Sequence, residues 1–266
     1  EQEMTQATIK YEDGQAYERG MGIWSQLTGQ DFLEWLAPVP GLRWIDIACG
    51  TGAFTELIMQ RCAPSEIQAL DPAEAQLVFA RQRSGSSGAT FIEGDAMALP
   101  FEDGRFDAAV MALALNLVPD PSKGVSEMVR VVRSGGTVST YIWDLPGGGF
   151  PYEPIQTEMH ALGMTPPQPP RADATVMAAL VKLWEDAGLE AIQTRQINVK
   201  RDFSKFEDFW SASTGTGLLR PTITAMARED LARLQARVRT RLGALKDGPV
   251  SHEAHANAIQ GRVPKI

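Results

Sequence analysis

One segment, residues 44–54, constrains the fold more than any other part of the chain. It begins with an apolar run of the kind that forms a buried strand, continues through two glycines two positions apart, and ends where helical spacing of apolar side chains begins. Glycine permits a tight turn, and a ligand can approach its backbone closely because no Cβ intervenes. The helix that follows starts with unpaired N–H donors. The segment predicts a strand–turn–helix unit that binds a ligand, although dinucleotide and nucleotide sites also use glycine turns.

Apolar runs typical of buried strands recur along the chain, and segments with helical spacing separate them. Strands that alternate with helices form a parallel sheet covered on both faces, and right-handed crossovers make it doubly wound. We therefore predict an α/β fold with a Rossmann-like, mostly parallel sheet of seven strands and helices on both faces. The predicted strands are residues 43–48, 66–71, 90–93, 106–112, 136–143, 189–199 and 251–264, and the predicted helices between them are residues 54–62, 72–81, 122–132 and 176–187.

Two segments predict a cover rather than a sheet layer. Residues 144–171 are rich in glycine and proline, which favours an irregular lid, and residues 204–247 carry an apolar stripe typical of a helical insertion. The predicted division of the chain is an N-terminal helical cover (1–35), a ligand-binding core (36–145), a lid with a helix and strand that complete the core (146–203), a helical insertion (204–247) and a C-terminal strand (248–266).

The charge balance disfavours a nucleic-acid partner. The 266 residues include 33 acidic and 25 basic side chains, a net charge of −8, and an acidic chain repels phosphate backbones. The dense basic stretch, four arginines within residues 233–241, lies near the end of a predicted helix, where cations complement the helix dipole. We interpret it as a solvated helix face.

Neither a membrane span nor a secretory signal is predicted. No apolar run approaches the roughly 20 residues that cross a bilayer, and residues 1–5 are acidic and polar. Cys49 and Cys62 form no CxxC pair, and His252 and His255 lack an evident third ligand, so neither a disulfide framework nor a metal site is predicted. A reducing, cytoplasmic location fits this cysteine usage. The oligomeric state is left open.

Three acidic residues lie at or just beyond the ends of successive predicted strands, at a regular interval. Asp46 and Asp71 are 25 positions apart, and Asp71 and Asp95 are 24 apart. Because parallel strands end at one edge of a sheet, where ligands bind, we expect these carboxylates to share that edge. The two oxygens of Asp71 could accept hydrogen bonds from two ribose hydroxyls.

Four segments in the same order resemble the motifs of class I S-adenosylmethionine-dependent methyltransferases. Residues 46–52 resemble the first motif, residues 94–96 the adenine-binding motif, residues 106–110 the fourth-strand motif, and residues 127–136 the run into the fifth strand. The likeness covers about residues 40–145, and within the class it is nearest to the small-molecule branch around menaquinone and ubiquinone C-methyltransferases.

The resemblance implies that the glycine turn holds the methionine and ribose parts of S-adenosylmethionine. Gly50 and Gly52 would line these parts, Asp46 would order the loop or meet the ammonium group, and Asp71 would hold the ribose hydroxyls. The implied contacts from this turn are Asp46, Ala48, Gly50, Thr51 and Gly52.

Further contacts are implied for the adenine and the sulfonium ends. Pro72 would pack on an adenine face, Asp95 would meet the adenine amino group, and the Ala96 N–H would meet a ring nitrogen. Backbone near Ala112 would contact the methionine amine. In addition, two aromatic residues of the N-terminal cover would close over the sulfonium, since aromatic faces attract such cations; they are Tyr17 and Trp24.

The sequence departs from the family pattern at two positions. Ala48 stands where glycine is common in the first motif, and Ser134 stands where proline often precedes the paired glycines. Neither change removes a group that the cofactor requires.

The resemblance implies methyl transfer to a small, moderately hydrophobic acceptor, with S-adenosylhomocysteine as product. Proximity, orientation and water exclusion can drive such an in-line displacement, so a base is needed only if the acceptor must lose a proton. His160 is the leading candidate base, and Asp144, Tyr152 and Glu153 are alternatives. The apolar side chains expected to line the acceptor pocket are Phe150, Tyr152, Met159, Phe203, Phe206, Phe209 and Trp210.

Two other functions remain as alternatives. A non-catalytic module could bind S-adenosylmethionine and transfer nothing. An NAD-dependent oxidoreductase would want a third glycine at position 55, where this chain has Thr55. The atom that accepts the methyl group is left open.

Overall fold

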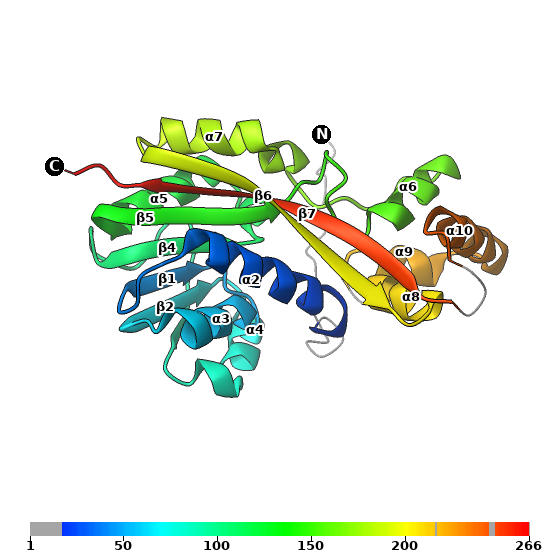
Figure 1. The fold of residues 1–266 in the computed structure, drawn as a ribbon, viewed down its shortest axis with the longest axis horizontal. Coiled ribbons are helices and arrows are strands. Elements are labelled where there is room, and N and C mark those ends of the chain that lie inside the picture. The colour runs from blue at the N-terminus through cyan, green and yellow to red at the C-terminus, as the bar shows by residue number, and fades with distance from the viewer. Residues whose placement is uncertain (1–17, 216, 245–247, 266) are drawn as a thin grey trace, which may run out of the picture. The chain divides into compact units, whose positions relative to one another are not determined.

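The computed structural model describes residues 18–215, 217–244 and 248–265. These residues form a seven-stranded sheet in the order β3-β2-β1-β4-β5-β7-β6 (Figure 1). Neighbouring strands from β3 to β5 pair in parallel, and β7 runs antiparallel to β5. The predicted α/β fold is confirmed. The strands are β1 (Arg43–Ile47), β2 (Glu66–Asp71), β3 (Thr90–Glu93), β4 (Phe106–Ala112), β5 (Val132–Trp143), β6 (Glu190–Phe203) and β7 (Val250–Arg262).

Helices cover both faces of the sheet. On one face, Val125 and Trp184 from α5 and α7 join the apolar side chains of the central strands in one buried cluster. On the other, the Tyr141 ring of β5 lies 4.5 Å from the ring of Phe32 in α2 and 5.4 Å from that of Phe54 in α3. These helices are α2 (Ile23–Leu36), α3 (Ala53–Cys62), α4 (Glu74–Ala80), α5 (Pro121–Val131) and α7 (Met177–Asp186).

The chain divides into two compact units. The larger unit comprises Ile23–Glu153, Pro169–Arg201 and His252–Ile266. The smaller unit comprises Glu1–Gly22, Pro154–Gln168 and Asp202–Ser251, of which the structure describes the parts given above. The remaining helices are α6 (Glu153–Ala161), α8 (Phe206–Thr214), α9 (Arg220–Ala225) and α10 (Arg228–Arg241), with short helical turns η1 (Glu18–Gly22), η2 (Ser84–Ser86), η3 (Leu115–Leu117) and η4 (Ala172–Thr175).

The segment predicted as an irregular lid contains a helix, so that prediction was wrong for its middle part. α6 begins at Glu153, and Pro154 is tolerated there because the first N–H groups of a helix have no intrahelical partner. Ile155 and Met159 are four positions apart and fully buried, as expected for one helical face. The glycines and prolines on either side of this short apolar pair concealed it.

The arginine-rich end of α10 is not a purely solvated face. Arg237 donates to Glu158 of α6 at 2.6 Å, and Glu158 is itself largely buried. Arg239 pairs with Glu207 of α8, and its guanidinium lies 4.2 Å from the centre of the Phe206 ring. These arginines therefore hold α10 against its neighbours within the smaller unit.

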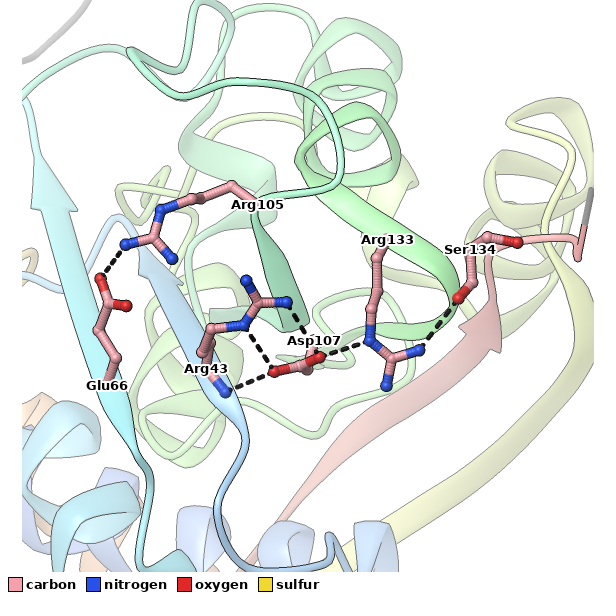
Figure 2. A network of polar contacts seen from close by, with 6 residues as sticks. All are labelled: Arg43, Glu66, Arg105, Asp107, Arg133 and Ser134. Carbon is pink, nitrogen blue, oxygen red and sulfur yellow. Dashed lines mark hydrogen bonds and ion pairs between the residues drawn. The ribbon is translucent and has the colours of Figure 1, made fainter.

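A network of ion pairs ties four strands together at the amino-terminal edge of the sheet (Figure 2). Asp107 of β4 accepts hydrogen bonds from the backbone N–H and the guanidinium of Arg43 in β1, and from Arg133 of β5. Beside it, Arg105 donates to Glu66 at the start of β2. Partial burial opposes ionisation of Asp107, but the bonds from Arg43 and Arg133 outweigh it and hold the pKa of this carboxyl well below its usual range.

β5 begins at Val132, four residues before the predicted start, and runs through the paired glycines. Gly136 needs its small size because a Cβ there would lie within 3 Å of the Asp107 carbonyl oxygen. The Ser134 hydroxyl donates to the Pro264 carbonyl at 2.7 Å, a bond that proline could not make. The departure at Ser134 thus adds a tie between the start of β5 and the C-terminal segment.

Candidate functional site

The first loop of the site turns through three residues in the left-handed backbone conformation. Ala48, Gly50 and Gly52 have φ values of 58°, 54° and 76°. At Gly52 a Cβ would lie 2.9 Å from the Cβ of Ala80, so both the conformation and the packing require glycine. At Gly50 a Cβ would meet nothing within 4 Å. Open space therefore borders the backbone of Gly50, as a turn that admits a ligand requires.

Asp71 at the end of β2 fixes this turn. Its Oδ2 accepts the Gly50 N–H at 2.8 Å, and its Oδ1 accepts the Ala73 N–H at 2.9 Å. Burial raises the pKa of Asp71, and these two backbone hydrogen bonds oppose the rise. An ionised carboxylate has about four acceptor sites, so both oxygens of Asp71 can still accept from ligand hydroxyls.

Asp46 is a fully buried acid at the carboxyl end of β1. Its Oδ2 accepts the Thr55 hydroxyl at 2.6 Å, whereas none of the described residues donates to its Oδ1. Burial raises the pKa of Asp46 to about 7; the Thr55 bond opposes the rise and the charge of Asp71 adds to it. A buried acceptor without a partner is costly, and a cationic or N–H-bearing ligand would satisfy it.

The third acid follows β3. Asp95 is exposed, and its Oδ1 accepts the Met97 N–H at 2.8 Å, while Ala96 is buried. The Gly94 N–H donates to the Asp71 carbonyl, which links this loop to the end of β2. The three predicted acids thus lie at or just beyond the carboxyl ends of three adjacent parallel strands, at one edge of the sheet, as their spacing predicted.

Two residues for which the sequence predicted no role in the site support the glycine turn. Thr55, in the first turn of α3, holds one oxygen of Asp46. The Arg83 guanidinium donates to the Thr51 carbonyl at 2.6 Å and to Glu56 at 2.8 Å. Thr55 lies where a dinucleotide motif would need glycine, and this departure was the sequence feature that could have indicated its role. Nothing in the sequence around Arg83 indicated its contact.

The other predicted site residues lie in different surroundings. Pro72 is exposed, and Ala112 ends β4. Trp24 of α2 is buried with its ring 5.7 Å from that of His252, in an edge-to-face arrangement. His160 is exposed on α6 of the smaller unit. Tyr17 falls outside the described residues.

The aromatic side chains predicted to line an acceptor pocket divide between the two units. In the larger unit, the Phe150 and Tyr152 rings pack edge-to-face, 5.0 Å apart. In the smaller unit, Phe209 packs between Phe203 and Phe206, with ring centres 5.4 and 6.2 Å away. The rings of the smaller unit therefore contribute to its interior packing.

Cys49 is buried beside the acids of the turn. Burial, together with the charges of Asp46 and Asp71, raises the pKa of its thiol far above the usual range. A thiol that resists ionisation is a poor nucleophile. Within residues 18–215, 217–244 and 248–265, no cluster of three or more metal-ligand side chains occurs.

Residues 45–140 match a family model described as a methyltransferase domain. The chain is 43% identical over 104 residues to a demethylmenaquinone methyltransferase of Desulfitobacterium hafniense, a match covering 37% of this chain and 41% of the relative. It is 41% identical over 95 residues to the chloroplastic 2-methyl-6-phytyl-1,4-hydroquinone methyltransferase 2 of rice, covering 36% and 27%. The chain thus spans less than half the length of these curated relatives.

A solved structure shares the fold. The phosphoethanolamine N-methyltransferase 2 of Haemonchus contortus, in complex with S-adenosyl-L-methionine, superposes with a TM-score of 0.58 over 94% of this chain and 56% of that one, at 16% identity. The strand order, the glycine turn and the family match together define residues 45–140 as a methyltransferase domain of class I. The resemblance predicted from the four motifs is confirmed.

Proposed function

We propose that this chain transfers a methyl group from S-adenosylmethionine to a small aromatic acceptor of the hydroquinone class. Two observations carry the cofactor assignment. One oxygen of the fully buried Asp46 carboxylate has no partner among the described residues, and four residues further along the chain the backbone of Gly50 is open to a ligand. An ammonium group and a ribose are the chemistry that these residues accept.

Three residues would hold the cofactor. The ionised Asp46 would face the ammonium group, Asp71 would accept from the ribose hydroxyls, and the backbone of Gly50 would pass close to the ligand. When bound, the cofactor supplies a methyl group on a sulfonium, whose leaving group needs no acid. The residues of this chain then act by binding, orienting and excluding water.

The acceptor class is supported by the relatives. Those named above are a demethylmenaquinone methyltransferase and a hydroquinone methyltransferase. The aligned stretches cover little more than a third of this chain. A hydroquinone is consequently the first acceptor to test.

No helix in the described ranges is long and apolar enough to cross a membrane; a cytoplasmic location and the absence of a nucleic-acid partner stay predictions.

The two alternatives differ from this proposal in what they bind and release. At position 55 a dehydrogenase would have glycine, whereas here Thr55 holds Asp46. A non-catalytic module would bind the cofactor and release no product.

The test is acceptor-dependent formation of S-adenosylhomocysteine, with a short-chain prenylated naphthohydroquinone that lacks the ring methyl as probe. We expect product only when both probe and S-adenosylmethionine are present. Cofactor binding without product from this probe or from simple phenols would support the non-catalytic module instead.

A further inference from the structure

A glycine-rich turn and a histidine, neither used by the cofactor site, meet at the carboxyl end of β5. The turn is the Gly147-Gly148-Gly149 stretch that follows Asp144, and the histidine is His255 of β7. All of these residues belong to the larger unit, as do the cofactor-site residues.

The turn is closed on itself and joined to His255 through the backbone. The Gly149 N–H donates to the Asp144 carbonyl at 2.7 Å, and the Gly147 N–H donates to Asp144 Oδ1 at 2.9 Å. The Asp144 N–H donates to the His255 carbonyl at 3.2 Å, and the His255 N–H donates to the Gly149 carbonyl at 3.0 Å. These four hydrogen bonds fix the backbone positions of Asp144 and His255.

Two of the glycines leave room for these groups, and at Gly149 the nearby backbone of His255 requires glycine. A Cβ at Gly147 would lie closer than 3 Å to the Asp144 carboxylate. A Cβ at Gly149 would lie closer than 3 Å to both the carbonyl oxygen and the ring Cδ2 of His255. The glycine-rich sequence therefore makes room for an acid and an imidazole next to each other.

Asp144 and His255 form a loosely paired acid and imidazole. Their closest atoms, Asp144 Oδ2 and His255 Nε2, are 3.7 Å apart, and the two side chains are 16% and 23% exposed. Since the Cδ2 edge of the ring packs on Gly149, Nδ1 lies on the other edge. In the part of the chain that the structure describes, Nδ1 has no hydrogen-bond partner.

The strand register places this pair at the same edge as the cofactor site. Tyr141 is level with Ala112, which ends β4 and is predicted to contact the methionine end, and Trp143 pairs with Ala256. Asp144 lies three residues beyond Tyr141, roughly 10 Å further along the strand. An acceptor ring and the imidazole side chain together could span that interval.

We propose that His255 is the base that takes a proton from the acceptor's aromatic hydroxyl, and that Asp144 is its positioning residue; this rests on the proposed function. The O–H bond breaks and its proton moves to Nδ1. The acceptor's electron pair forms the bond to the methyl carbon, while the C–S bond breaks and its pair stays on sulfur. If a ring carbon is methylated, the ring C–H then loses its proton to solvent, and the imidazolium returns its own to the oxygen.

His255 is better suited to this role than the predicted base His160. A carboxylate beside an imidazole fixes its tautomer and stabilises the imidazolium that forms. His160 is exposed, and no described residue forms a hydrogen bond or ion pair with its ring.

The first test needs no acceptor. The chain has three histidines, so their ring nitrogens can be assigned in ¹⁵N spectra of the full chain with one His→Gln variant each. We expect the neutral ring of His255 to carry its proton on Nε2, facing Asp144, and Asp144→Asn to change this tautomer balance. A proton on Nδ1 in the wild type, or no effect of Asp144→Asn, would overturn the proposal.

The second test separates the base from the cofactor site. With the naphthohydroquinone probe, His255→Gln should lower turnover by about 100-fold or more and leave the dissociation constant for S-adenosylhomocysteine within twofold. Imidazole added to His255→Ala should restore part of the rate, which a purely structural role would not predict. Glu253→Gln, on the same strand, is the matched control and should behave like wild type.

The outcomes of this second test distinguish failure of the proposed base from failure of the proposed function. Loss of turnover in His160→Gln but not in His255→Gln overturns the assignment of the base. A wild-type chain that binds S-adenosylhomocysteine but methylates neither the probe nor a simple phenol overturns it as well, while the cofactor site stands. Failure to bind S-adenosylhomocysteine at all contradicts the proposed function itself.

Discussion

At the scale of single residues, the protonation of Asp46 should affect both the stability of the fold and the binding of the ligand. Its folded pKa of about 7 lies above the value of 3.8 for a solvated aspartate. Between these values the native state keeps a proton that the unfolded state has lost, so this group makes stability fall as pH rises from about 4 to about 7. Above that window both states are ionised and the loss is complete.

Ligand binding should have the opposite dependence, because the ammonium group needs the ionised carboxylate. With a pKa near 7, about a tenth of Asp46 is ionised at pH 6 and about nine tenths at pH 8. We expect S-adenosylhomocysteine to bind about tenfold more tightly at pH 8, measured by calorimetry. Asp46→Asn should bind S-adenosylhomocysteine weakly at both pH values. Equal affinities of the wild type at pH 6 and pH 8 would contradict the assignment of Asp46 as the group that faces the ammonium.

Ala48 tests the conformation of the turn. A left-handed backbone costs a non-glycine residue about 1–2 kcal/mol. A glycine, in contrast, increases the conformational entropy of the unfolded chain, which lowers the free energy of unfolding by about 0.4–1 kcal/mol. The relief of backbone strain equals or exceeds the entropic cost, so Ala48→Gly should leave the free energy of unfolding unchanged or raise it by up to about 1.6 kcal/mol.

The matched control for Ala48 is Ala75→Gly in the exposed part of α4. Because its backbone is already helical, this substitution should lower stability by about 1 kcal/mol. Urea unfolding of both variants measures the difference. Equal losses would show that Ala48 is not strained.

At the scale of elements, apolar runs and glycine turns predicted the central strands closely. β2, β3 and β4 have the predicted bounds because each is a short, buried run with no competing pattern. α6 was missed because its buried pair, Ile155 and Met159, covers only one turn between glycine and proline clusters. Short-range patterns become ambiguous where an element is that brief.

The ion-pair network at the amino-terminal edge of the sheet should stabilise the central elements. Asp107→Asn leaves the guanidinium groups of Arg43 and Arg133 without their carboxylate, and we expect a loss of about 1–3 kcal/mol at pH 7 by urea unfolding. Because the folded pKa of Asp107 is depressed, the difference should shrink as pH falls below about 4.

Asp103→Asn is the control for this network. Asp103 pairs with Arg130 but is 81% exposed, so its loss should cost less than about 1 kcal/mol. Cofactor affinity should be unchanged in both variants, because the network lies at the opposite edge of the sheet from the site. A large change in affinity for Asp107→Asn would contradict this separation.

At the scale of the whole molecule, the sequence predicted local units better than contacts between distant segments. Asp46, Asp71 and Asp95 could be placed at one edge because each follows its own parallel strand. Asp144 and His255 could not be paired in advance, since 111 positions separate them and only the antiparallel pairing of β5 with β7 brings them together. The division into two compact units likewise depends on segments far apart in the chain.

Calorimetric titration of S-adenosylhomocysteine into the full chain shows directly whether the chain has a cofactor site for S-adenosylmethionine. We expect saturable binding by the wild type and by the exposed control Glu102→Gln, and at least a tenfold weaker affinity for Asp71→Asn, with no binding of NAD. Equal affinities for Asp71→Asn and the control, or binding of NAD in place of S-adenosylhomocysteine, would contradict it.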